Sequence, residues 1–191
     1  GGDWLASLPP VKSIMLADLP VVLILDGISP DVWLEALHSL DHTGLQARTQ
    51  WARLTAAPKT VDAVAALFGF DHDPMLEFAD RNIPYQQAKG NEEHNLADLI
   101  VPFVADRPAV VRLAMIDRIA HNRGIPLANM AAVLAGTLNK QIPPLLKLCT
   151  EYDRRLVITT DHGLSLDKGG LTHGQGGVYE QAIPRVESIA R

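Results

Sequence analysis

The chain has 191 residues, 47% of them hydrophobic and 20% charged, so it is long enough for one domain with a full core and barely long enough for two. We therefore expect a single domain over residues 1–191. Its formal charge of −5 argues against a protein that wraps nucleic acid with a basic surface. Two bound divalent cations would offset most of that charge, so an anionic substrate is not excluded.

The expected compartment is the cytoplasm. No apolar run reaches the roughly 18 residues that span a bilayer, and no basic start with a following apolar stretch indicates a signal peptide or a membrane partner. The single Cys149 cannot form an internal disulfide, which fits a reducing compartment. Because the sequence begins Gly1-Gly2-Asp3 without a methionine, we expect it to be a segment of a longer protein.

The hydrophobic pattern predicts strands that alternate with helices. Largely apolar runs indicate buried strands at 20–25, 109–116 and 155–160. In the first half of the chain we further expect a helix at 30–40 with Ser29 as N-cap, an extended edge segment at 45–54, and a helix that starts at Thr60 and stops at Gly69. Residues 71–93 are expected to form an excursion over the active face that contains a short helix. The remaining elements are a helix at 95–104 interrupted by Pro102, a helix at 127–152 that is bent or restarted at Pro143 and Pro144, and a glycine-rich loop at 163–177. This order predicts an α/β fold, a three-layer α/β/α sandwich with a mostly parallel central sheet.

Candidate metal ligands follow each of the three buried strands. In open α/β sheets ligands bind outside the carboxyl ends of the strands, so these side chains are expected to converge. They form three clusters: Asp26 alone, Asp117 with His121, and Asp161, His162 and His173 together. Mixed carboxylate and imidazole ligands suit zinc or manganese more than calcium.

Each cluster also has an ordinary structural explanation. Asp161-His162-Gly163 can be a turn with a capping carboxylate, and Asp26-Gly27 is a common turn sequence. A single Asp-x-x-x-His such as Asp117 with His121 arises often by chance, and a solvated loop accounts for His173. The occurrence of all the clusters after strands of one chain favours the metal site.

Thr60 is the best candidate nucleophile. It follows Pro58 at the predicted start of a helix, where free N–H groups and the helix dipole favour an anion. Coordination to a metal ion would also lower the pKa of the hydroxyl. A simple N-cap requires the same position, so both roles stay open for Thr60, and Thr55 is a less favoured substitute.

Taken together, these residues resemble the alkaline phosphatase superfamily, and within it the PglZ domain. The resemblance covers residues 20–185. It is carried by Val-Leu-Ile-Leu-Asp-Gly, Pro-x-Thr opening a helix, Met-Ile-Asp-Arg-Ile-Ala-His, Val-Ile-Thr-Thr-Asp-His-Gly and a final His-Gly. Five motifs in the family's order make chance a poor explanation, although no single motif is specific.

The resemblance implies an alkaline-phosphatase-like fold and two divalent ions, with Zn²⁺ expected and Mn²⁺ as the alternative. It implies one ion held by Asp26, Asp161, His162 and the Thr60 oxygen, and a second held by Asp117, His121 and His173. It further implies phosphate or sulfate ester cleavage through a covalent intermediate on Thr60. PglZ proteins belong to bacterial phage-exclusion (BREX-type) systems, so other defence proteins are expected partners.

The expected activity is that of a zinc-dependent phosphodiesterase, or nuclease-like hydrolase, acting on phosphate esters, nucleotides or oligonucleotides. The compact chain lacks large insertions that would close a monoester pocket, which favours a diester. Phosphomonoesterase, phosphomutase or sulfatase activity on the same metal core is the first alternative, and a non-catalytic metal-binding module in a defence complex is the second. The cations considered for the non-bridging oxygens are Lys59, Arg118, Arg123 and Lys168.

Overall fold

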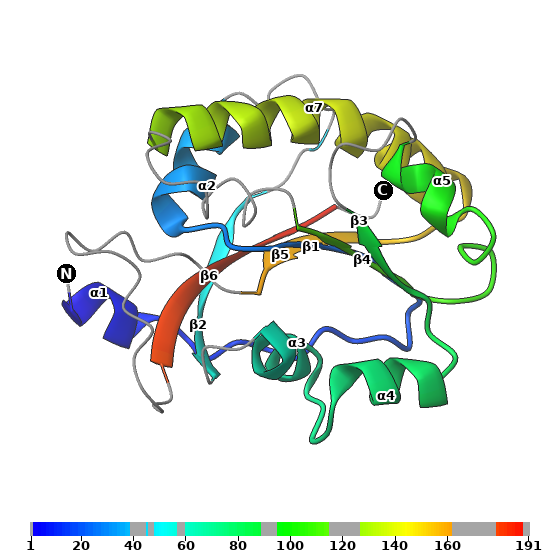
Figure 1. The fold of residues 1–191 in the computed structure, drawn as a ribbon, viewed down its shortest axis with the longest axis horizontal. Coiled ribbons are helices and arrows are strands. Elements are labelled where there is room, and N and C mark those ends of the chain that lie inside the picture. Colours follow the sequence, from blue (N-terminus) through cyan, green and yellow to red (C-terminus); the bar gives the residue numbers. More distant parts are fainter. Residues whose placement is uncertain are drawn as a thin grey trace.

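The computed structural model describes residues 2–38, 45, 48–56, 60–88, 95–114, 127–161 and 179–188. The elements are α1 (Gly2–Ser7), β1 (Val21–Leu25), α2 (Pro30–Leu37), β2 (Gln50–Ala56), α3 (Thr60–Phe68), α4 (Pro74–Asp80), β3 (Tyr85–Ala88), α5 (Leu96–Ile100), β4 (Ala109–Leu113), α7 (Leu127–Glu151), β5 (Leu156–Thr160) and β6 (Tyr179–Glu187). Figure 1 shows their arrangement around one central sheet.

Six of the described strands form this sheet in the order β2-β6-β5-β1-β4-β3. The strands β5, β1, β4 and β3 run parallel to one another, whereas β6 is antiparallel to both β5 and β2. Because β6 is antiparallel to both of its neighbours, β2 and β5 run in the same direction. The carboxyl end of β2 therefore lies at the same edge of the sheet as the carboxyl ends of β1 and β5. The predicted mostly parallel sheet is thereby confirmed.

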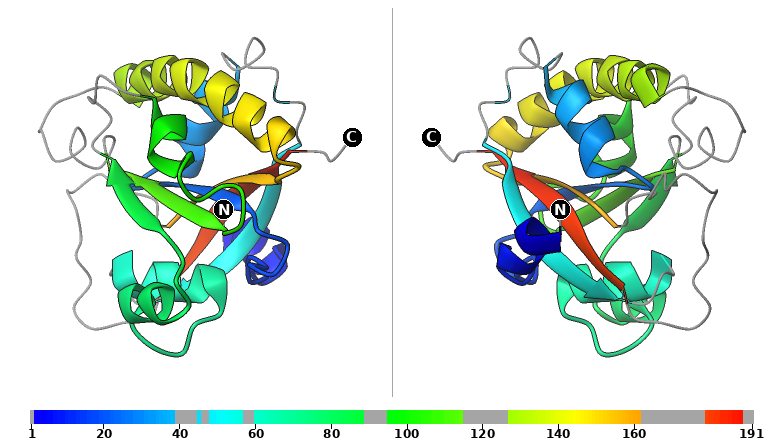
Figure 2. Two further views of the ribbon diagram at one scale, coloured as in Figure 1. Left: turned by 90° about the vertical axis from the view of Figure 1, so that its right-hand side faces the viewer. Right: turned by 90° about the vertical axis from the view of Figure 1, so that its left-hand side faces the viewer.

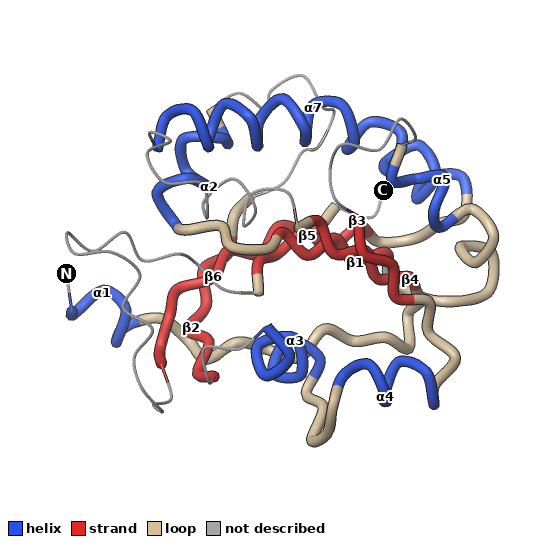
Figure 3. The backbone as a smooth tube through the Cα atoms, viewed as in Figure 1, coloured by secondary structure: helices blue, strands red, loops and turns tan. Residues whose placement is uncertain are grey.

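Helices cover both faces of the sheet, which confirms the three-layer α/β/α fold. Alternating side chains of each strand point to opposite faces, so each strand contributes to two cores. Leu23 packs with residues of α2, α5 and α7, whereas Val22 and Ile24 pack with residues of α3 and α4. Figures 1 and 3 show α2, α5 and α7 above the sheet and α3 and α4 below it, and the turned views of Figure 2 agree.

The three strands predicted from apolar runs are present as β1, β4 and β5, and nearly every residue in them is buried. Ser29 caps α2 as predicted, because its Oγ accepts a hydrogen bond from the Val32 N–H at 3.4 Å. Gly69 follows the end of α3 with φ +68°, as its helix-stop role requires. The predicted edge segment is the edge strand β2, shifted towards the carboxyl side.

Two features differ from the sequence-based expectations. Residues 71–93 contain the edge strand β3 as well as the expected short helix α4, and α4 packs on the sheet through Phe78. The carboxyl-terminal strand β6 and the short α1 were not expected at all. The helix α7 continues through Pro143 and Pro144, and Figure 2 shows its axis curving, so of the two predicted alternatives the helix is bent and does not restart.

Among the helices in the described ranges, none is long and apolar enough to cross a bilayer.

Candidate active site

Two buried carboxylates meet at the carboxyl edge of the sheet. Asp26 directly follows β1 and Asp161 directly follows β5, and the last residues of these neighbouring strands, Leu25 and Thr160, are in register. The exposed fraction is 2% for Asp26 and 0% for Asp161. The Asp26 N–H donates to the carbonyl of Leu113 at 3.0 Å, which extends the ladder between β1 and β4 beyond the strand and fixes the aspartate backbone. The structure thus brings together two of the predicted ligands.

Arg112 links the two carboxylates. It lies in β4 opposite Ile24 of β1, so its side chain leaves the sheet on the face covered by α3 and α4. Its Nη2 pairs with Oδ2 of Asp26, and its Nε lies 3.4 Å from Oδ2 of Asp161. Since β1 separates β4 from β5, the guanidinium spans the central strand to reach Asp161.

The backbone at Gly27 completes this arrangement. Its N–H donates to Oδ1 of Asp161 at 3.4 Å, and its φ is +71°. A side chain at this φ would be strained, so the glycine allows the chain to turn directly after Asp26 while the amide points at Asp161. The predicted Asp-Gly turn is therefore present, and it lies directly beside the Asp161 carboxylate.

The charges of this cluster suit a cation. Burying a carboxylate is costly unless it is paired, and here two carboxylates face one guanidinium, which leaves net negative charge on the three side chains. Carboxylate oxygens are ligands for zinc, manganese and magnesium. The donor set formed by Asp26 and Asp161 therefore fits a divalent metal ion. Within the described ranges, no group of three or more His, Cys, Asp or Glu side chains gathers as a complete metal site.

Tyr85 of β3 extends the polar cluster on the same face. Burial is the main reason that the pKa of Tyr85 lies above its ordinary value of 10.0, and the negative charges of Asp161 and Asp26 raise it further. The positive charge of Arg112 and its side-chain hydrogen bond with Tyr85 act in the opposite direction and lower the pKa. The phenol ring stacks on Phe78 with 5.2 Å between ring centroids and an interplanar angle of 18°. Tyr85 thus stays a neutral hydroxyl held beside the arginine.

Neither Arg112 nor Tyr85 was selected from the sequence. For Arg112 a signal existed, because a single charge within the apolar run Ala-Val-Val-Arg-Leu requires a buried partner. For Tyr85 there was none, since the strand Tyr-Gln-Gln-Ala has no apolar pattern.

Thr60 is the first residue of α3, as the sequence predicted. This helix follows β2, whose carboxyl end lies at the same edge as Asp26 and Asp161, and α3 covers the face to which Arg112 points. The structure describes the backbone of Thr60 and not its side chain. The helix start is confirmed, and the role of the hydroxyl stays a prediction.

The remaining selected residues lie outside the described residues. They follow β4, follow Asp161 or precede α3, and their roles stay predictions. They are the candidate ligands Asp117, His121, His162 and His173 and the candidate phosphate-binding residues Lys59, Arg118, Arg123 and Lys168.

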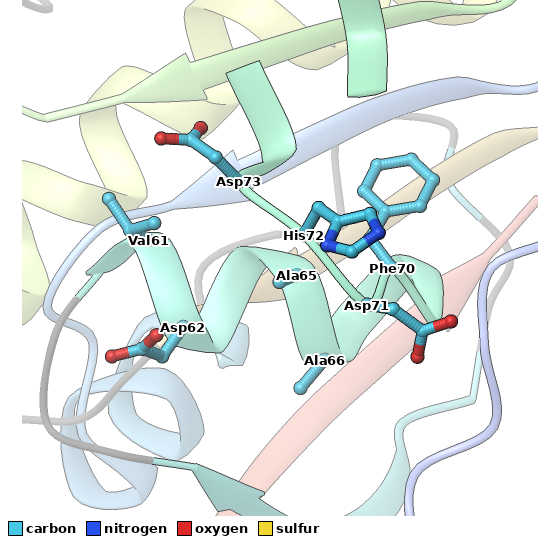
Figure 4. A pocket seen from close by; sticks show the side chains of 8 residues that line it. All are labelled: Val61, Asp62, Ala65, Ala66, Phe70, Asp71, His72 and Asp73. Carbon is cyan, nitrogen blue, oxygen red and sulfur yellow. The ribbon is translucent and has the colours of Figure 1, made fainter. Parts of the chain in front are cut away.

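A surface hollow of about 380 Å³ lies on the outer side of α3 and is separate from the carboxylate pair. Figure 4 shows carboxylates and an imidazole around it, with small apolar side chains of α3 at its base. Its lining residues are Val61, Asp62, Ala65, Ala66, Phe70, Asp71, His72 and Asp73. Because no lysine or arginine lines this hollow, its negative charge would repel a phosphate ester.

No family model matches the sequence, and no curated protein matches it. Among solved structures, the chain is similar to the C-terminal periplasmic domain of EcEptC from Escherichia coli, with 11% identity over 97% of this chain and 77% of that one and a TM-score of 0.42. For the complex of that domain with Zn, the identity is 14% over 97% of this chain and 78% of that one, and the TM-score is 0.37. For a mutant of TAB5 alkaline phosphatase with Mg bound, the identity is 12% over 89% of this chain and 65% of that one, and the TM-score is 0.26. With every TM-score below 0.5, the residues of the site itself carry the functional proposal.

Proposed function

We propose that the protein is a divalent-metal-dependent hydrolase of phosphate esters, with phosphodiesters of nucleotides or oligonucleotides as the preferred class. The observation that carries this proposal is the pair of buried carboxylates, Asp26 and Asp161, at the ends of adjacent parallel strands. Two buried acidic groups placed side by side at this edge of an α/β sheet are typical of a ligand site.

In this proposal the first ion is held by Asp26, Asp161, His162 and Thr60, and the second by Asp117, His121 and His173. Zinc is the expected metal and manganese the alternative. When bound, such a pair of ions supplies charge stabilisation for the attacking and leaving oxygens of an in-line displacement. The Gly27 N–H orients the Asp161 carboxylate, and the Leu113 carbonyl holds the backbone of Asp26 at the same sheet edge.

Thr60 is the proposed nucleophile. Its oxygen forms a bond to phosphorus while the bond to the leaving ester oxygen breaks, and the leaving group departs with the electron pair and takes up a proton. The threonine proton is released to water. Water then adds to the phosphorus of this threonine ester while the bond between the Thr60 oxygen and phosphorus breaks; the Thr60 oxygen takes up a proton, and the phosphate monoester is released. The position at the start of α3 supports this role, since the helix dipole favours the developing negative charge.

The test is turnover of bis(4-nitrophenyl) phosphate by the purified protein after loading with Zn²⁺ or Mn²⁺. Thr60→Ala is expected to lose at least about 10³-fold in turnover, as for other covalent nucleophiles. Thr55→Ala is the matched control, because Thr55 is an exposed residue of β2, and it should retain wild-type turnover. If Thr60→Ala keeps full turnover and Thr55→Ala loses it, the nucleophile is Thr55 and not Thr60.

Substrate comparison separates the alternatives. Faster turnover of 4-nitrophenyl phosphate or of the sulfate ester than of the diester would favour the monoesterase, mutase or sulfatase activity. If chelation lowers the thermal midpoint while no ester is hydrolysed, the protein is a metal-binding module without catalysis.

A role in a bacterial phage-exclusion system, together with other defence proteins, belongs to the same proposal. Its only support is the resemblance of the five motifs to PglZ domains. The measurement is the plating efficiency of phage on host cells that carry the wild-type gene or a Thr60→Ala allele. Equal plating on both would contradict a catalytic role in defence.

A further inference from the structure

Arg112 forms ion pairs with both Asp26 and Asp161. Its side chain is 12% exposed and the two aspartates are almost fully buried, so the three charges interact in a medium that screens them weakly. The guanidinium contacts one oxygen of each carboxylate. It therefore lies between the two groups, where a metal ion shared by them would also lie.

A guanidinium and a divalent ion held by the same two carboxylates repel each other. Oδ2 of Asp161 accepts from Arg112, while Oδ1 of Asp161 accepts from the Gly27 N–H. Each carboxylate oxygen has two lone pairs, so these hydrogen bonds do not block coordination, but the charges of the guanidinium and the ion oppose each other in a site that screens them weakly. The Gly27 amide is fixed in the backbone, whereas the Arg112 side chain has several rotatable bonds, so the arginine is the group that can move away.

Tyr85 gives Arg112 a second, neutral partner. The phenol is fixed by its stack on Phe78 and shares a side-chain hydrogen bond with Arg112. This contact lies on the β3 side of the guanidinium, away from β5. An arginine that has lost its contacts with the carboxylates would still have this neutral partner.

We propose that Arg112 is an internal counter-cation, which holds Asp26 and Asp161 together in the metal-free protein and competes with a divalent metal ion for their oxygens. The inference rests on the proposed metal-dependent function. Without metal, the guanidinium compensates the carboxylates and lets the strand ends pack. Metal binding displaces it, and by thermodynamic reciprocity the arginine weakens metal binding as much as the metal weakens the ion pairs.

The test compares Arg112→Met with the wild type. Methionine keeps much of the apolar stem and removes the charge. We expect the apo variant to have a lower thermal midpoint than the apo wild type, and its affinity for Zn²⁺, measured by competition with a chromophoric chelator, to rise by on the order of tenfold. The rise in thermal midpoint on adding Zn²⁺ is therefore larger in the variant.

Arg155→Met is the matched control. Arg155 also bridges two carboxylates, Asp18 at 3.0 Å and Glu187 at 2.9 Å, but it does so at the amino end of β5. It should leave the Zn²⁺ affinity unchanged. If both substitutions change the affinity equally, net charge is responsible and the proposal is overturned.

The outcomes separate this inference from the proposed function. Zn²⁺ binding by the wild type with equal or weaker binding by Arg112→Met overturns the competition and leaves the function standing. No Zn²⁺ or Mn²⁺ binding by either protein contradicts the proposed function itself. If Arg112→Met folds only when Zn²⁺ is present, the competition is supported. If it does not fold even then, Arg112→Gln decides, because glutamine removes the charge and keeps a hydrogen-bond donor for the carboxylates, and an unchanged affinity in that variant overturns the inference.

Discussion

Arg112 in β4 and Asp161 after β5 are separated by 49 residues and by the whole of strand β1, yet Nε of the arginine lies 3.4 Å from Oδ2 of the aspartate. This contact joins three strands of the sheet at their carboxyl edge, because the same guanidinium also pairs with Asp26. The two carboxylates are thus positioned by the ends of adjacent strands, and the guanidinium by a third strand.

Conservative substitution of the carboxylates tests their role as ligands. Asp26→Asn and Asp161→Asn keep the side-chain shape and remove the charge, so we expect an unchanged circular dichroism spectrum. Turnover of the diester in zinc-loaded protein should fall by more than about 100-fold, a loss at the upper end of that seen for partners of metal ligands. The control is Asp106→Asn, because the Asp106 side chain is 74% exposed. Retained turnover and metal content in both site variants would remove these residues from the ligand set.

Two glycines are expected to respond in opposite directions to alanine. Gly69 has φ +68°, and an added Cβ would lie 2.5 Å from Oγ of Ser13, so Gly69→Ala should lower the free energy of unfolding by about 1–2 kcal/mol or more. Gly136 lies inside α7 with no atom within 4 Å of an added Cβ, so Gly136→Ala should raise it by up to about 1 kcal/mol. Urea unfolding of the two variants measures both changes. Stabilisation by Gly69→Ala would contradict the left-handed conformation at the end of α3.

The side chain of Gln141 joins two helices above the sheet. It is buried, and its Oε1 accepts a hydrogen bond from the Leu96 N–H at the start of α5 at 2.8 Å. Gln141→Leu leaves this buried N–H without its acceptor, which should cost about 1–3 kcal/mol. For a chain of this length the thermal midpoint should fall by roughly 2–10 °C. The exposed neighbour Lys140, replaced by alanine, should leave the midpoint nearly unchanged.

Cys149 is expected to be unreactive in the folded protein. Burial raises the pKa of its thiol from the ordinary 9.0 to about 12, and the nearby charge of Arg154 offsets only part of this rise. Iodoacetamide should therefore label Cys149 in concentrated guanidinium chloride and not under native conditions, as measured by intact mass. Rapid native labelling would show that α7 opens.

The same thiol contributes a pH dependence of stability. Above about pH 9 the unfolded chain loses this proton while the folded protein keeps it, so the unfolded state is favoured as the pH rises towards 12. The contribution is fully present below pH 9. Cys149→Ala should show a weaker fall in stability over this range than the wild type.

Local sequence determined the elements whose signals do not depend on distant residues. The apolar runs of β1, β4 and β5 predict strands buried on both faces, because no solvated face is available to them. Ser29 and Gly69 mark helix ends through their own backbone and side-chain chemistry. Since Asp26 and Asp161 end two such runs, their convergence at one edge of the sheet was predictable.

Tertiary contacts determine the secondary structure of the segments whose local sequence disfavours it. Pro184 argues against a strand within a sheet, yet β6 pairs on both sides, and its Pro184 carbonyl accepts from Oγ1 of Thr159 at 2.8 Å. Pro143 and Pro144 disfavour a continuous helix, yet α7 is kept because its apolar face packs on the sheet. The bridge from Arg112 to Asp26 and Asp161 follows the same principle, because side chains from separate strands meet only when strand order and register are set.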